Sequence, residues 1–419
     1  MKLLFIIPYA PTRIRTRSYN LLQELHARGH AITLATLWST PNELDALTQW
    51  QSQGIHVVSA KLPRHRSLRN ALRALPTKTP LQAVYSWEPT LASQISALVA
   101  QENFDACHVE HLRGALYGTL VQRAATQHGK SLRVIWDSVD CISTLFEQTA
   151  TSSQSFSSRS TARLEESRTR TFEAKMAECF DATTVVTSAE RAAFCKLSET
   201  MRGNSALVKQ RMHVVPNGVD MNYFTRVDVP RDPATIVFSG KMSYHANFTA
   251  ATFLIDEIMP LVWQLVPNAQ VLIVGQNPHA SLLRRAQENP THIQVTGAVP
   301  DMRPHLSRAT VACAPMVYGV GVQNKILEAM AMQIPVIASQ HAAAALPIAD
   351  GRELLIGTDA ASISAQLIRA LQDSTLRADL AQRGYAFVAQ NYRWQDSAEK
   401  FEHLYQGKRF DDSRSDTHA

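Results

Sequence analysis

Short, continuous runs of apolar residues alternate along this chain with segments that have the periodicity of a helix. The first run, over 3–7, is followed by a helical segment over 17–28 and then by a second apolar run over 31–36. A strand that is apolar at every position is buried on both faces, as in a parallel sheet covered by helices. The chain is therefore predicted to be an α/β protein with doubly wound parallel sheets. Further strands are expected over 55–58, 106–109, 132–136, 182–188, 214–215, 235–239, 271–274, 293–296, 311–314, 335–338 and 353–356.

Two such sheets are expected, because 419 residues exceed what one hydrophobic core usually organises. The tight turn Pro-Asn-Gly-Val-Asp over 216–220 marks the junction between an N-terminal domain, 1–213, and a C-terminal domain, 214–391. The Ser/Thr-rich segment 150–161 is predicted to be a mobile loop, and the polar tail 408–419 to be disordered. The natural arrangement is two Rossmann-like domains that face each other across a cleft.

The net charge indicates which partners this protein binds, and the cysteine content indicates in which cellular compartment it works. The net charge of +6 favours anionic partners, a class that includes phosphates, nucleic acid and anionic lipid. The five cysteines are scattered without close pairs, which indicates a reducing compartment and neither a disulfide framework nor a zinc site. No apolar run approaches the roughly 18 residues that span a bilayer, and the apolar start of the chain is too short for a signal peptide. A cytoplasmic location is therefore expected.

The segment 318–340 contains a glycine loop that leads into a helix. Gly319 and Gly321 lie in a polar turn, a helix is predicted to follow over 325–332, and Pro335 ends it. Free N–H groups at a helix N-terminus, together with the helix dipole, bind phosphate or diphosphate. Glu328, one turn inside this helix, is placed to accept hydrogen bonds from a ribose diol. The alternative is an ordinary loop–helix–strand unit with a solvated Glu, since a single glycine loop is a weak signal.

Five short motifs follow one another in the second half of the chain. In this order and spacing they resemble the C-terminal domain of the family-4 glycosyltransferases, which have the GT-B fold. The motifs are Pro216-Asn217-Gly218-Val219-Asp220, Phe238-Ser239-Gly240-Lys241, Val274-Gly275, Thr296-Gly297-Ala298-Val299 and Leu327-Glu328-Ala329-Met330-Ala331. The runs 299–304 and 319–332 are also similar to the sugar transferases associated with exosortase (PEP-CTERM) polysaccharide systems. The family's last helix returns to the first domain, which implies the same for 392–407.

The resemblance implies a donor site in the C-terminal domain. Glu328 matches the second Glu of the family's Glu-(seven residues)-Glu motif, which holds the donor ribose, whereas the first Glu is replaced by Val320. Lys241 stands where the family has a basic residue for the diphosphate, and the second basic residue, expected six positions later, is Asn247. Lys325 is placed to supply that missing charge. The alternative is that both lysines are solvated surface residues.

The replacement of the first Glu puts the contacts to the donor sugar in doubt. It leaves the implied phosphate cradle in place, because that cradle is made by backbone N–H groups. The expected donor-binding residues besides Glu328 are Gly240, Gly297, Gly319, Gly321, Val322, Gln323 and Asn324.

The N-terminal domain departs further from the family, because its first loop, 11–17, lacks the usual glycine pair. Three arginines occupy this loop instead: Arg13, Arg15 and Arg17. They either bind a phosphate on the acceptor side through guanidinium forks or form a solvated basic loop.

Two further positions on the acceptor side follow predicted strands. The family's active-site histidine matches His111 better than His108; it either hydrogen-bonds a donor-sugar hydroxyl or is a structural histidine. Asp137 and Asp140 follow the strand over 132–136, at the carboxyl end where open α/β sheets bind ligands.

The resemblance implies glycosyl transfer from a nucleotide diphosphate sugar to a hydroxyl, with retention of anomeric configuration, in exopolysaccharide or other surface glycan assembly. His111, Lys241 and Lys325 are the predicted catalytic residues, and the two lysines stabilise the departing diphosphate together with backbone amides. No Asp-x-Asp motif is present near the expected cleft, so no essential metal or other cofactor is expected. The implied partners are the nucleotide sugar and a glycan or lipid-linked acceptor, and not nucleic acid.

Two alternatives remain open at this stage. A catalytically inactive protein that binds nucleotide sugars or glycans is suggested by Val320 and by the altered first loop. A nucleotide-sugar 2-epimerase shares the GT-B fold but needs acid and base carboxylates beside the sugar.

The segment 61–78 is basic and contains no Asp or Glu. Leu68, Leu72 and Leu75 fall on one face of a helix. This pattern is typical of a protein that rests on an anionic bilayer, here the inner face of the cytoplasmic membrane. The alternative is that these leucines pack on the core and the basic residues are solvated.

Overall fold

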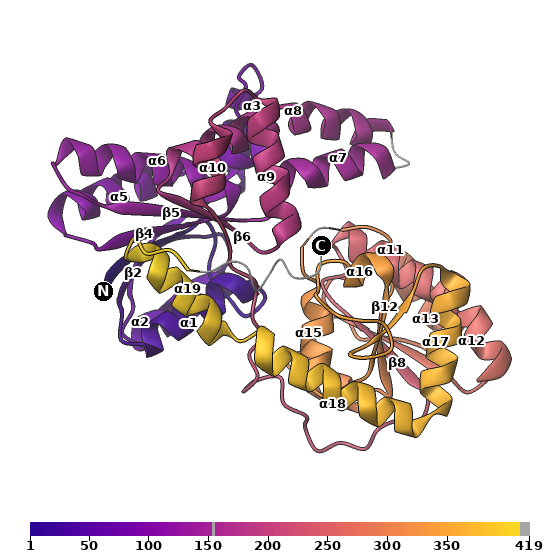
Figure 1. Ribbon diagram of the computed structural model, residues 1–419. Helices are drawn as coiled ribbons and strands as arrows, with labels where there is room; N and C mark the ends of the chain where they lie inside the picture. The colour runs from indigo at the N-terminus through magenta and orange to yellow at the C-terminus, as the bar shows by residue number, and fades with distance from the viewer. Residues whose placement is uncertain (153–155, 320, 411–419) are drawn as a thin grey trace. The chain divides into compact units, whose positions relative to one another are not determined.

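The computed structural model describes residues 1–152, 156–319 and 321–410 (Figure 1). The chain divides into two compact units. Unit 1 comprises Met1–Pro216 together with the chain from Trp394 onward, and unit 2 is Asn217–Arg393. Each unit contains one parallel sheet with helices around it.

Unit 1 is built on a sheet of seven parallel strands in the order β3-β2-β1-β4-β5-β6-β7. The strands are β1 Lys2–Ile7, β2 Ala31–Trp38, β3 His56–Lys61, β4 Ala106–Glu110, β5 Arg133–Val139, β6 Ala182–Val185 and β7 Met212–Val214. Leu4 and Ile6 of β1 belong to the hydrophobic cluster on one face, and Leu3, Phe5 and Ile7 to the cluster on the other. Burial on both faces is the physical reason for the continuous apolar runs.

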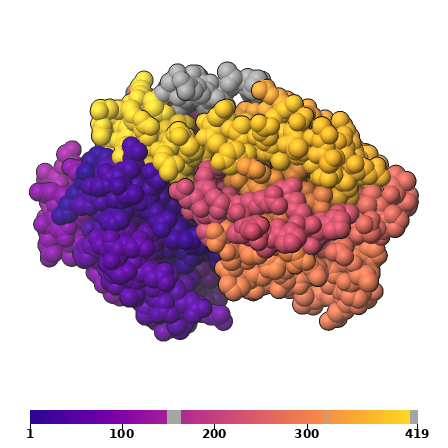
Figure 2. Space-filling model, turned by 90° about the horizontal axis from the view of Figure 1, so that it is seen from below, coloured from indigo at the N-terminus to yellow at the C-terminus, as the bar shows by residue number. Residues whose placement is uncertain are grey.

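Helices cover both faces of this sheet (Figure 1). The cluster that contains Phe5 is closed by α1 Thr16–Ala27, α2 Pro41–Ser52 and α19 Trp394–Tyr405. α19 packs on α1, and in Figure 2 the yellow surface at the end of unit 1 lies against the indigo N-terminal surface of the same unit. The remaining helices of unit 1 are α3 Arg64–Ala74, α4 Leu81–Tyr85, α5 Pro89–Gln101, α6 His111–Gln127, α7 Ile142–Ser152, α8 Phe156–Cys179, α9 Ser188–Thr200 and α10 Ser205–Arg211.

The predicted mobile loop over 150–161 is wrong for the residues described, because α7 continues to Ser152 and α8 begins at Phe156. Ser and Thr lower helix stability by only a few tenths of a kcal/mol per residue relative to Ala. Composition alone therefore does not end a helix when α7 and α8 pack along each other. Helix α9 begins after Thr187, which forms a capping box with Glu190.

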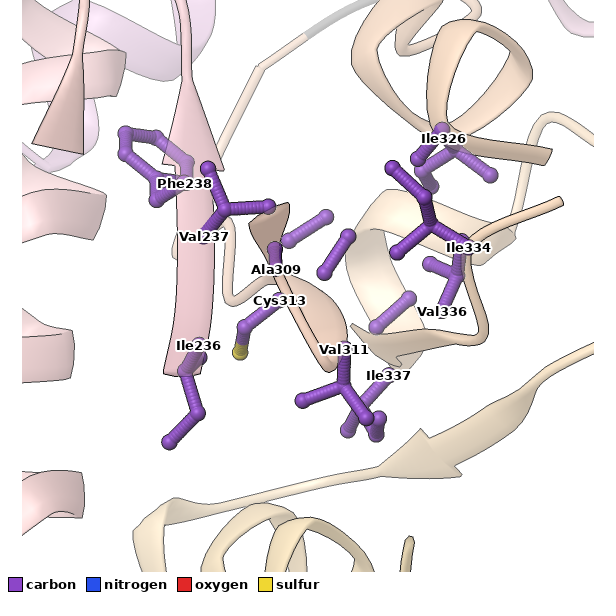
Figure 3. Close-up of a cluster of buried hydrophobic side chains, with 14 of the residues drawn as sticks. Ile236, Val237, Phe238, Ala309, Val311, Cys313, Ile326, Ile334, Val336 and Ile337 are labelled. Atoms are coloured by element: carbon purple, nitrogen blue, oxygen red, sulfur yellow. The ribbon is translucent and has the colours of Figure 1, made fainter. Parts of the chain in front are cut away.

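Unit 2 contains six parallel strands in the order β10-β9-β8-β11-β12-β13. The strands are β8 Thr235–Ser239, β9 Gln270–Val274, β10 Ile293–Val295, β11 Val311–Ala314, β12 Val336–Ser339 and β13 Leu355–Gly357. The two sheets confirm the predicted fold class. Figure 3 shows side chains of three neighbouring strands, among them Phe238, Val311 and Ile337, gathered with Ile326 in one buried cluster.

The helices of unit 2 follow the strands in alternation. They are α11 His245–Phe253, the π-helical η1 Leu254–Ile258, α12 Met259–Leu265, α13 Ala280–Glu288, α14 Arg303–Arg308, α15 Asn324–Ala331, α16 Gln340–Ala343, α17 Ala360–Gln372 and α18 Ser374–Asn391. None of the helices within the described ranges is both long and apolar enough to cross a membrane.

Candidate functional site

Two glycines bring the loops after β8 and β9 of unit 2 into backbone contact. The N–H of Gly240 donates to the carbonyl of Val274 at 3.0 Å. Gly240 and Gly275 have φ values of 149° and 155°, which side chains disfavour. A Cβ on Gly275 would lie 1.7 Å from the carbonyl oxygen of Gly240. Only glycine therefore allows these loops to meet at the carboxyl edge of the sheet, where open α/β sheets bind ligands.

The glycine loop before α15 lies at the same edge. Gly319 and Gly321 have φ values of 149° and 70°, and Nε2 of His341 donates to the carbonyl of Gly319 at 2.9 Å. The capping residue of α15 is Gln323, whose side chain makes no capping hydrogen bond. The N–H groups at the start of α15, predicted over 322–324 to bind phosphate, thus have no side-chain cap. Val320 lies outside the described residues.

Lys325 projects from the first turn of α15 toward α11. Its Nζ donates to Oδ1 of Asn247 at 2.9 Å and to Oε1 of Gln323 at 3.2 Å. The Nδ2 of Asn247 in turn donates to the carbonyl of Lys241 at 3.1 Å. Burial lowers the pKa of Lys325 to about 8, although Glu328 opposes the shift, so its ammonium is largely charged at pH 7. The structure thus brings the ammonium of Lys325 and the backbone of Lys241 to one side chain, that of Asn247.

Glu328 lies one turn further along α15 and is half-buried. Burial raises the pKa of its carboxyl to about 7, while Lys325 lowers it. No described residue donates a hydrogen bond to this carboxylate, which leaves it open to a ligand. Lys241 is exposed, and Gly297 follows β10 with a φ of 71°.

A cavity of about 460 Å³ adjoins the glycine loop within unit 2. Tyr318, from the same loop, hydrogen-bonds His245 on α11 and lies 3.4 Å from Oγ1 of Thr249. The cavity therefore continues the candidate site over the carboxyl ends of β11 and β12. Its lining includes Phe248, Thr249, Met316, Ser339, Gln340 and His341.

Arg17 and Asp137 form a buried ion pair in unit 1, with side-chain exposures of 5% and 0%. Nε and Nη2 of Arg17 donate to the two carboxylate oxygens at 2.6 and 2.9 Å, and Nη1 donates to the carbonyl of Val215 at 3.0 Å. Thr184 donates to the same carboxylate at 2.7 Å. Burial opposes ionisation of Asp137, but Arg17 and His108 hold its pKa well below the usual range. The hydrogen-bonding capacity of this pair is thus used inside unit 1, and only Arg13 and Arg15 of the predicted basic loop are exposed.

The two histidines considered at the end of β4 have different surroundings. His108 is buried, with Nδ1 2.9 Å from the Tyr405 hydroxyl and Nε2 3.5 Å from Asp137. His111 opens α6 with a φ of 64°, a conformation that costs a non-glycine residue on the order of 1–3 kcal/mol and is common at functional sites. Burial, with a contribution from Arg113, lowers the pKa of His111 to about 3, so its ring is neutral at pH 7.

Two carboxyl groups at this edge of unit 1 were not predicted from the sequence. The hydroxyl of Tyr9 donates to Glu110 at 2.5 Å, and burial raises the pKa of Glu110 to about 7. Burial and the neighbouring Asp140 raise the pKa of Glu190 to about 9. Glu110 directly follows a predicted strand and could have been found by that signal, whereas Glu190 reaches the site through a helix cap. In the part of the chain that is described, no three His, Cys, Asp or Glu side chains are grouped to hold a metal ion.

Two family models match the chain. "Glycosyl transferase 4-like domain" matches residues 14–218, and "Glycosyl transferases group 1" matches residues 233–373. Together they cover well over half of the sequence. The chain belongs to the family-4 glycosyltransferases. The family resemblance predicted from the five motifs is thereby confirmed, and the association with exosortase systems stays a prediction.

Individual relatives are similar over shorter stretches. The phosphatidyl-myo-inositol mannosyltransferase of Mycolicibacterium smegmatis is 31% identical over 188 residues, which are 43% of this chain and 48% of that protein. The match thus spans about half the length of that relative.

Solved glycosyltransferase structures share the fold over almost the whole chain. Anabaena Alr3699/HepE in complex with UDP and glucose has a TM-score of 0.65 at 11% identity and covers 97% of this chain and 100% of its own. Sucrose-phosphate synthase from Thermosynechococcus elongatus has a TM-score of 0.66 at 18% identity, with 97% and 98% covered. The predicted GT-B fold is therefore confirmed.

Proposed function

We propose that this protein transfers a glycosyl group from a nucleotide diphosphate sugar to a hydroxyl acceptor, with retention of anomeric configuration. The observation that carries the proposal is the start of α15. There a charged Lys325, an unbonded Glu328 carboxylate and an N-terminus without a side-chain cap lie within two turns of one helix. This arrangement supplies what a nucleoside diphosphate needs: positive charge for its phosphates and an acceptor for its ribose hydroxyls.

The chemistry follows from the charge that develops during transfer. The bond between the anomeric carbon and the diphosphate oxygen breaks, and the electron pair leaves with the diphosphate. The anomeric carbon bonds to the acceptor oxygen on the same face, and the acceptor proton passes to the leaving diphosphate. Lys325, Lys241 and the first N–H groups of α15 stabilise the negative charge, and fixed groups of this kind are often the largest single contribution to catalysis.

Unit 1 supplies polar groups for the sugar and the acceptor. His111 is neutral, so it can donate to a sugar hydroxyl from one ring nitrogen and accept at the other. Arg13 and Arg15 are exposed, and each lies over a tyrosine ring, Tyr19 and Tyr9 respectively. Their guanidinium groups are suited to a phosphate on the acceptor. We expect no essential metal, because the two lysines and the helix N-terminus carry the positive charge.

The comparisons support a particular class of substrate. One structural relative was solved with UDP and glucose, and the similar mycobacterial enzyme is named for mannosyl transfer to phosphatidyl-myo-inositol. A hexose nucleotide as donor and a glycan or lipid-linked acceptor fit both names. Assembly of an exopolysaccharide or another surface glycan is the corresponding role.

The exposed side chains around helix α3 favour binding of the protein to a membrane surface. Leu68, Leu72 and Leu75 are exposed by 63%, 58% and 48%, so they do not pack on the core as the alternative required. Arg69 and Arg73 are exposed beside them on the same helix. Apolar and cationic side chains that share one exposed helix suit an anionic bilayer. The proposed location is the cytoplasm, with peripheral attachment to the inner face of the cytoplasmic membrane.

Binding and turnover of a panel of nucleotide sugars, including UDP-glucose and GDP-mannose, test this proposal. A donor at 100 times its dissociation constant should stabilise the fold by about 2.7 kcal/mol. Release of nucleotide should then require a hydroxyl acceptor. Absence of stabilisation by every donor would overturn the assignment. Stabilisation without turnover would favour the non-catalytic alternative, and nucleotide release without any acceptor would favour the epimerase.

A further inference from the structure

Unit 1 has a cavity of its own at the amino ends of its strands, where β5, β6 and β7 begin. This is the edge of the sheet opposite to the one that carries His111. The cavity has a volume of about 330 Å³. We call it the amino-edge pocket. Its charged and titratable lining residues are Arg133, Asp181, Arg211, His213, Lys408 and Arg409. Ligands of open α/β sheets bind at the carboxyl ends of the strands, so this pocket is separate from the edge that carries Glu110, His111 and Asp140.

The end of α19 builds one wall of this pocket. Gly407 has a φ of 71°, its N–H donates to the carbonyl of Leu404, and the N–H of Lys408 donates to the carbonyl of His403. This pair of bonds ends the helix with a left-handed glycine and turns the following residues back toward the sheet. A Cβ on Gly407 would lie 2.7 Å from Nη2 of Arg133, so the glycine also makes room for that guanidinium.

The charges around the pocket are unbalanced. Asp181 is its single acidic lining residue, and the Asp181 carboxylate already accepts the N–H of Val134 at 2.8 Å. Nη1 of Arg211 donates to the carbonyls of Glu178 and Phe180 at 3.0 and 2.9 Å, which fixes its guanidinium beside the cavity.

Three cationic side chains have no carboxylate partner within the described ranges: Arg133, Lys408 and Arg409. Folding thus gathers them with Arg211 around one cavity, and Asp181 is the one carboxylate among the described residues that line it.

We infer that the amino-edge pocket binds a phosphate-bearing anion, either a phosphate monoester or a diphosphate. A single negative charge would leave the group of cations unbalanced, whereas a phosphate ester or diphosphate carries two or more. Guanidinium groups bind phosphate oxygens in pairs, which suits Arg133 and Arg211. The volume is about ten times that of one water in the liquid, roughly 30 Å³, and leaves room for more than a single phosphate. This inference is independent of the proposed glycosyl transfer.

Titration calorimetry with inorganic pyrophosphate tests the inference on the full chain. Because pyrophosphate is also expected to bind at α15, every protein in the test carries Lys325→Ala and Lys241→Ala. The double change Arg133→Glu/Lys408→Glu should weaken the remaining binding by tenfold or more, since each charged hydrogen bond is individually strong. Lys196→Glu, at an exposed position of α9 outside the pocket, is the matched control and should leave the affinity unchanged.

Unchanged pyrophosphate affinity in the double variant would overturn the inference, as would an equal loss in the Lys196→Glu control. An unaltered melting temperature and circular dichroism spectrum would show that the double variant is folded. If the double variant is not folded, the milder change Arg133→Gln should still weaken binding measurably.

A phosphate can come from a soluble ester or from a lipid headgroup, and flotation with phosphatidic acid vesicles separates these sources. Because α3 is itself expected to bind anionic vesicles, every protein in this test carries Arg64→Glu, Arg69→Glu and Arg73→Glu. Remaining flotation that is lost on adding Arg133→Glu/Lys408→Glu would identify a lipid phosphate. No remaining flotation, with pyrophosphate binding intact until Arg133→Glu/Lys408→Glu is added, would identify a soluble phosphate ester.

Discussion

Nζ of Lys325 lies 2.9 Å from Oδ1 of Asn247, although 78 residues separate them in the sequence. The resemblance to the family implies a basic residue at position 247 itself, where this chain has Asn. Here the positive charge comes from the first turn of α15 instead and reaches the same place. The positive charge beside Asn247 in this chain is thus supplied by α15.

The first prediction concerns this ammonium. Lys325→Ala should lower kcat by about 10²-fold or more with a smaller change in KM, because removal of one preorganised charge-stabilising group has an effect of that order. Steady-state kinetics measure this effect, and Lys196→Ala is the control at an exposed site. The double variant Lys325→Ala/Asn247→Lys should recover most of the activity. If the double variant is as slow as Lys325→Ala, a positive charge at position 247 does not replace the ammonium of Lys325, and the interpretation is wrong.

The second prediction concerns the ribose contact at Glu328. Glu328→Ala should weaken donor binding by tenfold or more, since a hydrogen bond to a charged group contributes roughly 1.5–3 kcal/mol. Calorimetric titration with the best donor of the panel measures the loss. Glu328→Gln keeps one acceptor oxygen and should lose less. Equal affinity of wild type and Glu328→Ala, with both proteins folded, would remove Glu328 from the donor site.

The third prediction is a pH optimum for donor binding. The carboxyl of Glu328 has a pKa raised to about 7, so it becomes the stronger acceptor as the pH rises through 7. Lys325 has a pKa lowered to about 8, so it loses its charge as the pH rises through 8. Donor affinity should therefore be highest between these values. Glu328→Gln should flatten the acidic side of the profile and leave the alkaline side. A profile that is flat between pH 6 and 9 in the wild type would contradict both assignments.

The strands could be predicted from the sequence because both faces of the sheet are buried, so consecutive residues of a strand are apolar. β1 contributes Leu4 and Ile6 to one hydrophobic cluster and Phe5 to the other, so no polar residue interrupts its run. The end of α7 and the start of α8 were mispredicted as a loop, because their composition resembles a loop while the two helices pack against each other. Local composition does not predict this packing of one helix against another.

The candidate site was predictable only in part, for a similar reason. Glu328 and Lys325 belong to one continuous motif, whereas Glu190 meets Asp140 only after folding. The amino-edge pocket joins Arg133 and Lys408 from opposite ends of the chain, and no local pattern indicates that they meet. The sequence left two readings of Leu68, Leu72 and Leu75, and their exposure separates these readings.

The fourth prediction concerns the buried pair of Arg17 and Asp137. Asp137→Ala leaves a guanidinium without its counter-ion in the interior and should destabilise the protein by roughly 3–5 kcal/mol. Chemical denaturation measures this, with Asp45→Ala as the control at an exposed position of α2. Since the pKa of Asp137 is held below its unfolded value, its contribution is present above about pH 4 and falls as the pH drops. Asp137→Ala should accordingly be less sensitive to acid than the wild type in the same pH range.

The last prediction concerns α3 and the membrane. Arg64, Arg69 and Arg73 are exposed, whereas Arg66 lies 3.9 Å from Glu88 and is left unchanged. Each basic residue near an anionic surface contributes around 1 kcal/mol, which salt screens. The wild type should therefore float with anionic vesicles, not with neutral ones, and less so at high salt. The triple variant Arg64→Glu/Arg69→Glu/Arg73→Glu should abolish flotation without lowering the melting temperature, because none of these arginines is buried.

The apolar half of the same surface needs its own variant. The triple variant Leu68→Ser/Leu72→Ser/Leu75→Ser should float less than the wild type at low salt. The difference should remain at high salt, since salt does not screen apolar insertion. Leu265, which is 65% exposed on α12 in unit 2, provides the matched control through Leu265→Ser. If the leucine variant and the control float equally well, α3 does not insert, and the arginines alone account for any binding. If the arginine variant also floats like the wild type, α3 is not the membrane surface.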